Sequence, residues 1–153
     1  MVIVWKSKMS IDKDIIDEDH KTLIKIINSV ETALKEGKRG KDLMSNIQEL
    51  KKYTDDHFER EESILKKIEC PNYDQQTNKH EYLIIQLNDI ISDLLGLRGE
   101  RDQDKAIPKL VKTLKSWLMG HVLKDDMKIK PFIEAAKKDR GIKGHPFTEK
   151  LGN

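Results

Sequence analysis

The chain has 153 residues, 37% of them hydrophobic and 37% charged, which is enough for the core of one domain if the apolar residues are well segregated. The 29 Lys and Arg residues nearly balance the 27 Asp and Glu residues, and the two signs are interspersed. This pattern is typical of a solvated surface and argues against a nucleic-acid-binding or membrane-binding face. The single cysteine, Cys70, excludes an internal disulfide framework.

Glycine and proline divide the chain into four predicted helices, at about 17–36, 41–68, 73–96 and 104–136. Residues 1–14 form a predicted N-terminal arm, and residues 137–153 form a basic, polar tail. Short connections between long helices predict an all-α, up-down-up-down antiparallel four-helix bundle. We therefore expect one domain over residues 1–136, followed by the tail.

The N-terminal segment lacks the apolar core of a signal peptide. The longest apolar stretch, residues 82–97, is interrupted by amide and acidic side chains and does not predict a membrane span. We expect a soluble, cytoplasmic protein.

Along each predicted helix, apolar residues recur at steps of three or four, which is typical of the buried seam of a bundle. Polar residues interrupt this seam at six positions: His20, His57, Glu61, Gln76, His80 and His121. Each buried polar group without a partner costs about 1–3 kcal/mol. Six such residues in one core must therefore satisfy one another or share a ligand.

The spacing of these residues places them at one height in the bundle. His20 and His57 lie about 18 residues to either side of the first turn, ~27 Å from it at 1.5 Å per residue. His80 and His121 lie about 20 residues to either side of the third turn. Asp126 follows His121 by five residues, which does not match the three- or four-residue steps of the seam. It can lie at the same level if the helix unwinds slightly or if its side chain extends far enough. This mixture of imidazoles and carboxylates suits iron, zinc, copper or manganese, and two metals better than one.

These residues resemble the pattern of the hemerythrin family. The family carries a histidine on helix one, H-x-x-x-E on helix two, H-x-x-x-H on helix three and H-x-x-x-x-D on helix four. Here "IDEDHKTLIKIIN" contains His20, "HFEREE" contains His57 and Glu61, and "WLMGHVLKDD" contains His121 and Asp126. In "CPNYDQQTNKHEYL", His80 matches the second histidine of the helix-three motif and Gln76 stands at the first. With the N-terminal "VIVW", the resemblance covers about residues 1–135 and is closest to the single-domain bacterial hemerythrins.

The resemblance implies two iron ions, bridged by Glu61, Asp126 and a solvent-derived oxygen. The iron held by His20 and His57 would have an open position for dioxygen. The other iron would be held by His80 and His121. Gln76 would ligate it through the amide oxygen, hydrogen-bond a ligating water, or cap the site without ligating.

Apolar residues next to the predicted ligands suit the lining of an oxygen pocket that excludes water: Leu23, Ile27, Trp117, Leu118 and Val122.

Three functions fit this site. Reversible dioxygen binding would serve storage, delivery or sensing, and sensing would require an unidentified protein partner. A diiron enzyme would act on peroxide, nitric oxide or oxygen. A metal-handling bundle would do neither. A ferritin-like enzyme is disfavoured, because the chain contains no Glu-x-x-His.

Overall fold

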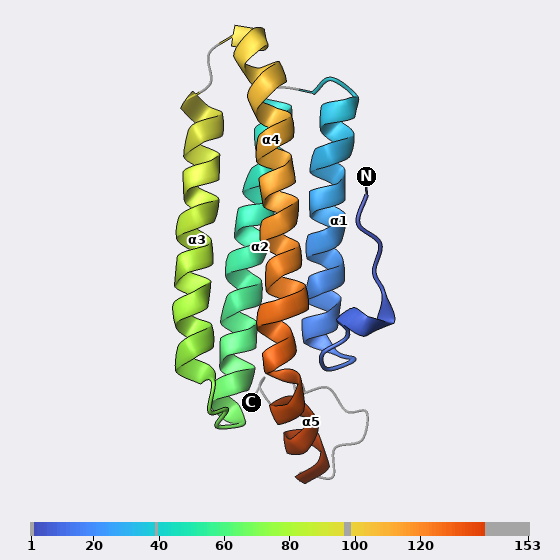
Figure 1. Ribbon diagram of the computed structural model, residues 1–153, viewed down its shortest axis with the longest axis vertical. Coiled ribbons are helices and arrows are strands. Elements are labelled where there is room, and N and C mark those ends of the chain that lie inside the picture. Colours follow the sequence, from blue (N-terminus) through green and yellow to red (C-terminus); the bar gives the residue numbers. More distant parts are fainter. Residues whose placement is uncertain (1, 39, 97–98, 140–153) are drawn as a thin grey trace.

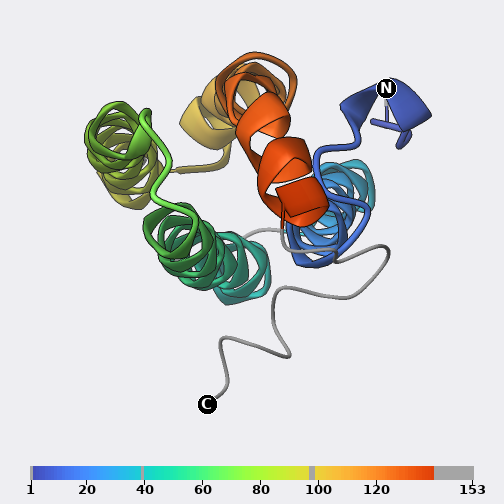
Figure 2. The same ribbon diagram turned by 90° about the horizontal axis from the view of Figure 1, so that it is seen from below.

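The computed structural model describes residues 2–38, 40–96 and 99–139, and all of the regular secondary structure in these ranges is helical (Figure 1). The four long helices are α1 (Ile15–Lys35), α2 (Gly40–Lys67), α3 (Tyr73–Gly96) and α4 (Gly99–Gly120). Consecutive helices run in opposite directions, and α4 returns to pack on α1, so the four surround one core (Figure 2). The predicted antiparallel bundle is confirmed.

The fourth predicted helix is not continuous. After Gly120 the chain forms a π-helical turn (His121–Asp125) and a 3-10 turn (Asp126–Lys128), and then α5 (Lys130–Asp139), which lies at the end of the bundle where α1 begins (Figure 1). A single helix over 104–136 was therefore the wrong expectation. Helix α5 also includes residues 137–139 of the expected tail, and residues 140–153 lie outside the described part of the chain.

The start of α1 is fixed by two buried carboxylates, each of which accepts a hydrogen bond from a backbone N–H group at or next to the other residue. Asp12 accepts hydrogen bonds from the backbone N–H groups of Ile16 and Asp17 at 2.9 and 3.1 Å. Asp17 accepts one from the backbone N–H of Ile11 at 2.7 Å. The first N–H groups of a helix have no partner within the helix, so these bonds define where α1 begins. They also fix the height of His20, five residues into the helix.

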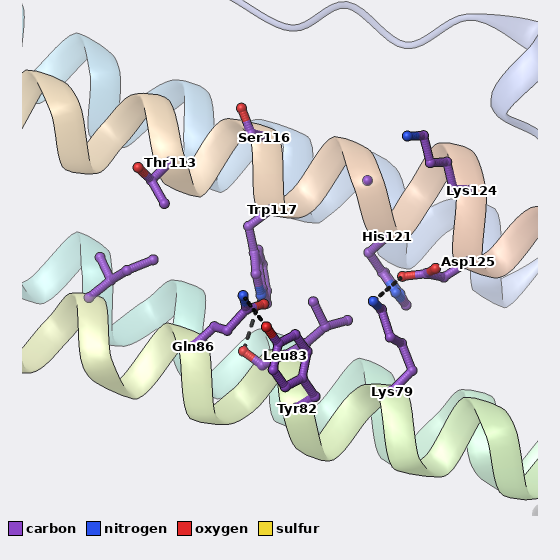
Figure 3. A pocket seen from close by; sticks show the side chains of 12 residues that line it. Lys79, Tyr82, Leu83, Gln86, Thr113, Ser116, Trp117, His121, Lys124 and Asp125 are labelled. Carbon is purple, nitrogen blue, oxygen red and sulfur yellow. Dashed lines mark hydrogen bonds and ion pairs between the residues drawn. The ribbon is translucent and has the colours of Figure 1, made fainter.

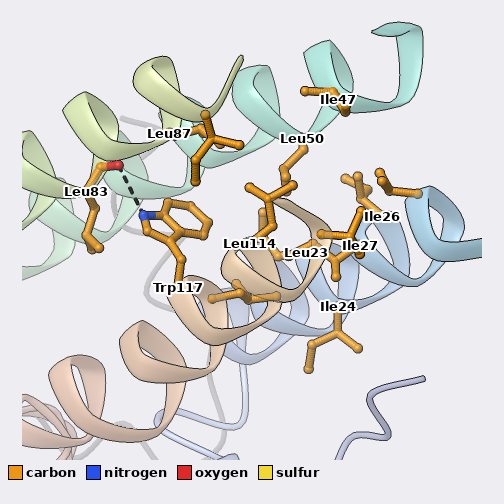
Figure 4. Close-up of a cluster of buried hydrophobic side chains, with 14 of the residues drawn as sticks. Leu23, Ile24, Ile26, Ile27, Ile47, Leu50, Leu83, Leu87, Leu114 and Trp117 are labelled. Atoms are coloured by element: carbon orange, nitrogen blue, oxygen red, sulfur yellow. Dashed lines mark hydrogen bonds between the residues drawn. The ribbon is translucent and has the colours of Figure 1, made fainter. Parts of the chain in front are cut away.

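Helices α3 and α4 are joined across the core by Trp117, whose indole N–H donates to the carbonyl oxygen of Leu83 at 3.1 Å (Figure 3). This bond satisfies the polar atom of a large buried side chain. Around it lies the larger apolar cluster, to which all four long helices contribute (Figure 4). Its labelled members include Leu23, Ile27, Leu50, Leu87 and Leu114.

A smaller apolar cluster fills the end of the bundle beside α5, and includes Ile16 and Ile64. On α1, His20 lies between Ile16 of this cluster and Leu23 of the larger one. On α2, Glu61 lies between Ile64 of the smaller cluster and Phe58 of the larger one. The polar seam residues are therefore enclosed by apolar packing on both sides.

In the part of the chain that the structure describes, no helix combines the length and the apolar character needed to cross a membrane.

Candidate metal centre

Seven side chains from the four helical segments meet at one level of the core. Helix α1 supplies His20, α2 supplies His57 and Glu61, and α3 supplies Gln76 and His80, while the fourth segment supplies His121 and Asp126. None of the seven is more than 4% exposed. The structure thus brings together all of the residues that the sequence predicted as metal ligands, and their binding of metal stays a prediction.

The π-helical turn explains how Asp126 reaches this level. A π-helix inserts one residue into a turn, so positions five apart share a face that an α-helix gives to positions four apart. His121 opens the π-helical turn and Asp126 follows it directly. The Nε2 atom of His121 lies 2.8 Å from Oδ2 of Asp126. Of the two routes expected from the sequence, local unwinding is the one observed.

All four imidazoles turn Nε2 toward the two buried carboxylates. Nε2 of His20 lies 2.6 Å from Oδ2 of Asp126. Nε2 of His57 lies 3.3 Å from Oε2 of Glu61, and Nε2 of His80 lies 3.1 Å from Oε1 of the same residue. The set is imidazole nitrogen and carboxylate oxygen, which suits divalent first-row transition metals.

The arrangement fits a bound cation. One ligand atom from each of five residues lies within 4.8 Å of the others: His20, His57, Glu61, His121 and Asp126. Two of the buried atoms at this centre, Oε2 of Glu61 and Nε2 of His80, lack a hydrogen-bond partner in the described part of the chain. Unsatisfied buried polar atoms are rare in folded proteins, and metal bound at this centre would satisfy these.

The electrostatics of the cluster also favour a cation. Burial opposes the charge of His57, but hydrogen bonds with Asp126, Asp19 and Glu61 raise its pKa well above the usual value. Burial likewise opposes the charge of Asp126, but the neighbouring His121 and His20 lower the pKa of that carboxyl well below its usual value. The buried carboxylate of Asp126 is therefore ionised and requires positive charge beside it.

Gln76 contacts both carboxylates. Its Nε2 donates to Oε1 of Glu61 at 3.2 Å and to Oδ1 of Asp126 at 3.1 Å. The side chain occupies the place where the family pattern has an imidazole, and it holds the two carboxylates in fixed positions. Ligation through its amide oxygen stays a prediction.

Asp19 is a component of the site that the sequence did not indicate. Its Oδ2 accepts a hydrogen bond from Nδ1 of His57 at 3.0 Å. Arg60 donates to both oxygens of Asp19, at 2.9 and 2.8 Å, and the Tyr53 hydroxyl donates to Oδ1 at 3.0 Å. Burial would raise the pKa of Asp19, but the bonds from His57 and Arg60 outweigh it and lower the pKa to about 2. Asp19 therefore holds the proton of His57 on Nδ1 and leaves Nε2 free for a metal.

His80 is oriented in a comparable way. Its Nδ1 lies 2.9 Å from Oε1 of Glu62, and its ring stacks on Phe58 with 3.9 Å between centroids and 3° between planes. Nδ1 of His20 and Nδ1 of His121 are buried without a partner among the described residues. One imidazole in each predicted metal position therefore has a carboxylate behind it.

The expected pocket-lining residues are all buried and belong to the larger apolar cluster: Leu23, Ile27, Trp117, Leu118 and Val122. On the outer side of Trp117 and His121, a groove of about 380 Å³ runs between α3 and α4 (Figure 3). Lys79 and Asp125 face each other across it, 4.0 Å apart, beside His121. The groove brings the surface of the protein to the outer edge of one predicted ligand.

Fold and site together define a metal-binding protein of the helical-bundle class, with imidazole and carboxylate side chains gathered from every long helix. Residues 12–133 match the family model described as the hemerythrin HHE cation binding domain. This match covers most of the chain, and the chain therefore belongs to the hemerythrin family.

Relatives from three organisms align with most of the chain. A bacteriohemerythrin of Clostridium acetobutylicum is 28% identical over 129 residues, which cover 82% of this chain and 96% of the relative. A hemerythrin-like protein of Naegleria gruberi is 25% identical over 126 residues, covering 82% and 89% of the two chains. A bacteriohemerythrin of Campylobacter jejuni is also 25% identical over 126 residues, covering 82% and 91%.

Proposed function

We propose that this chain is a non-heme diiron protein that binds dioxygen reversibly. The observation that carries the proposal is the way in which the two carboxylates face the imidazoles. Oε1 of Glu61 faces His80 and Oε2 faces His57. Each oxygen of this carboxylate thus points to a different histidine, as a carboxylate that bridges two metal ions requires.

Asp126 divides its oxygens differently, between imidazoles and an amide. Oδ2 faces His20 and His121, while Oδ1 accepts the hydrogen bond from Gln76. Two ferrous ions together supply the two electrons that reversible dioxygen binding uses. The chain's own part is to hold both ions at fixed separation and to leave one position open, which the resemblance places beside His20 and His57.

Reversibility depends on the apolar residues around the site. Leu23 and Ile27 follow His20 on α1, and Leu118 and Val122 flank His121. All four are at most 1% exposed. Such a lining excludes water and mobile protons, which slows the loss of the oxygen ligand in reduced form.

Gln76 favours a second candidate, a diiron enzyme acting on peroxide, nitric oxide or oxygen. An amide is a weaker donor than an imidazole and leaves a more exchangeable position on the metal beside it. If that position controls reactivity, the Gln76→His variant should lose its oxygen-dependent spectrum more slowly than the parent. If the oxygen-dependent spectrum decays at the same rate in both proteins, Gln76 gives no support for an enzyme.

The test is to reconstitute the metal-free protein anaerobically with ferrous iron, measure iron per chain, and record absorption spectra before air, after air and after purging with argon. We expect two irons per chain and a spectral change that purging reverses. Glu61→Ala should lose at least one iron, whereas Glu59→Gln, an exposed carboxylate on the same helix, should not. Irreversible consumption of oxygen would favour the enzyme. Full metal loading without any response to oxygen would favour a metal-handling bundle.

A further inference from the structure

The two halves of the centre are unequally equipped. Three imidazoles gather around one oxygen, Oδ2 of Asp126, at Nε2 distances of 2.6 Å for His20, 2.8 Å for His121 and 3.6 Å for His57. Glu61 completes the set, with its Oε2 at 3.3 Å from His57. These are the five residues whose ligand atoms all lie within 4.8 Å of one another.

His121 stands between the two halves but turns its ligand atom to the first. Its ring centroid is 5.6 Å from that of His57 and 5.4 Å from that of His80. Its Nε2, however, lies 3.4 Å from Nε2 of His57. The resemblance pairs His121 with His80, whereas the distances between ligand atoms group it with His20 and His57.

The second half offers one imidazole. Nε2 of His80 faces Oε1 of Glu61, and the amide of Gln76 donates both to that oxygen and to Oδ1 of Asp126. A metal entering here gains a single ring nitrogen. It must also displace the amide N–H from the two carboxylate oxygens that it needs, which costs the energy of those charge-assisted hydrogen bonds.

One ring of the first half, that of His57, has a more deeply buried partner than its counterpart in the second half. Asp19 fixes the ring of His57 and is itself held by Arg60 and Tyr53. The corresponding partner of His80 is Glu62, whose side chain is 26% exposed against 3% for Asp19. Ligands held in place before binding lose less conformational freedom when the metal arrives.

We propose that the centre binds divalent metal in two unequal steps, first at the five-residue cluster of His20, His57, Glu61, His121 and Asp126, and then, more weakly, at the position of His80 and Gln76. The inference rests on the proposed function only in that both positions hold metal. At limiting metal the protein carries one ion, and the two-metal form appears only when the metal supply rises.

The test is an anaerobic calorimetric titration of the metal-free full chain with Co²⁺ and with Fe²⁺. We expect one ion to bind tightly and a second to bind at least about tenfold more weakly. Gln76→His should tighten the second step more than the first. Gln75→His, the same change at the neighbouring exposed residue, is the matched control and should alter neither step.

Two further variants assign the steps to residues. His80→Ala should remove the second step and preserve the first, whereas His20→Ala should weaken the first. Circular dichroism verifies that each variant is folded. If His80→Ala is unfolded, the conservative Gln76→His variant tests the assignment of the second step instead. Two equal steps in the parent protein, or loss of the first step in His80→Ala, would overturn the inference. Equal steps together with reversible oxygenation would leave the proposed function standing. Unequal steps with no oxygen response at full loading would reject the function and retain the inference.

Discussion

Asp19→Asn tests whether the carboxylate behind His57 contributes to metal binding. In the native protein Asp19 accepts hydrogen bonds from His57, from Tyr53 and twice from Arg60. Asparagine has the same shape but only one accepting oxygen. In either orientation of the amide, its NH₂ group therefore faces donors that it cannot accept from.

The size of the effect follows from the role of such partners. Loss of a carboxylate that orients a metal-binding histidine typically weakens metal affinity 10- to 100-fold, or about 1.4–2.7 kcal/mol. Because His57 belongs to the five-residue cluster, the loss should fall on the tighter of the two binding steps. The weaker step, at His80 and Gln76, should change by less than about threefold, since Asp19 touches neither residue.

The assay is competition for Co²⁺ between the protein and a chelator of known affinity. Glu18→Gln is the control, because Glu18 lies on the same turn of α1 and its side chain is 70% exposed. Among the ion pairs of the described residues, Glu18 takes part in one, with the exposed Lys21. Unfolding of the metal-free variants by urea separates lost metal affinity from lost stability. If Asp19→Asn binds the first metal as tightly as the parent, Asp19 has no role in the site and the reasoning fails.

Three other predictions test the fold around the site. Hydrogen bonding to Lys115 lowers the pKa of Glu31 to about 2 from its usual 4.5. The ion pair therefore stabilises the fold above pH 4.5, and this stabilisation is lost as the pH falls toward 2. The difference in unfolding free energy between the parent and Glu31→Gln should shrink over that range, and a difference independent of pH would contradict this. Leu87→Ala, at a fully buried position in the larger apolar cluster, should lower the free energy of unfolding by about 2–5 kcal/mol. The melting temperature should fall by roughly 5–15 °C, and the number of metals bound should not change. A loss of unfolding free energy below about 1 kcal/mol would show that the cavity collapses. Deleting residues 141–153 should leave iron content unchanged, because all of the predicted ligands lie between residues 20 and 126; loss of iron would assign a role to the tail.

The bundle and the level of the site were predictable because both depend on short-range periodicity. Steps of three and four residues place Ile16, His20, Leu23 and Ile27 on one stripe of α1, and three of these four are apolar. A histidine on such a stripe must be buried, whatever it binds. Equal distances from the turns then set the height, and the structure encloses His20 between Ile16 and Leu23.

The support of His57 was not predictable in this way. Asp19 lies next to His20 in sequence but supports the histidine of another helix, and its partners Tyr53 and Arg60 are 34 and 41 residues away. No local pattern links such residues, because the contact exists only once α1 and α2 are packed. The sequence indicates slight unwinding after His121 only as one of two alternatives and does not predict the π-helical turn, since the spacing from His121 to Asp126 requires a shared face but does not state how the backbone provides it.

Glu61 and Asp126 explain why the polar cluster is tied to a bound ion rather than to packing alone. Both are fully buried, and the negative charge of Asp126 opposes ionisation of Glu61. Burial, the largest effect, raises the pKa of Glu61, yet the adjacent imidazoles of His57 and His80 lower it below the usual value. A buried charge pair is rarely more stable than apolar residues of the same volume. Apolar side chains at these two positions would join the two clusters into one continuous core, so the carboxylates reduce the stability that this bundle could reach. A metal shared between them, as proposed above, would return that stability only while it is bound, and this would link the folding of the chain to its metal supply.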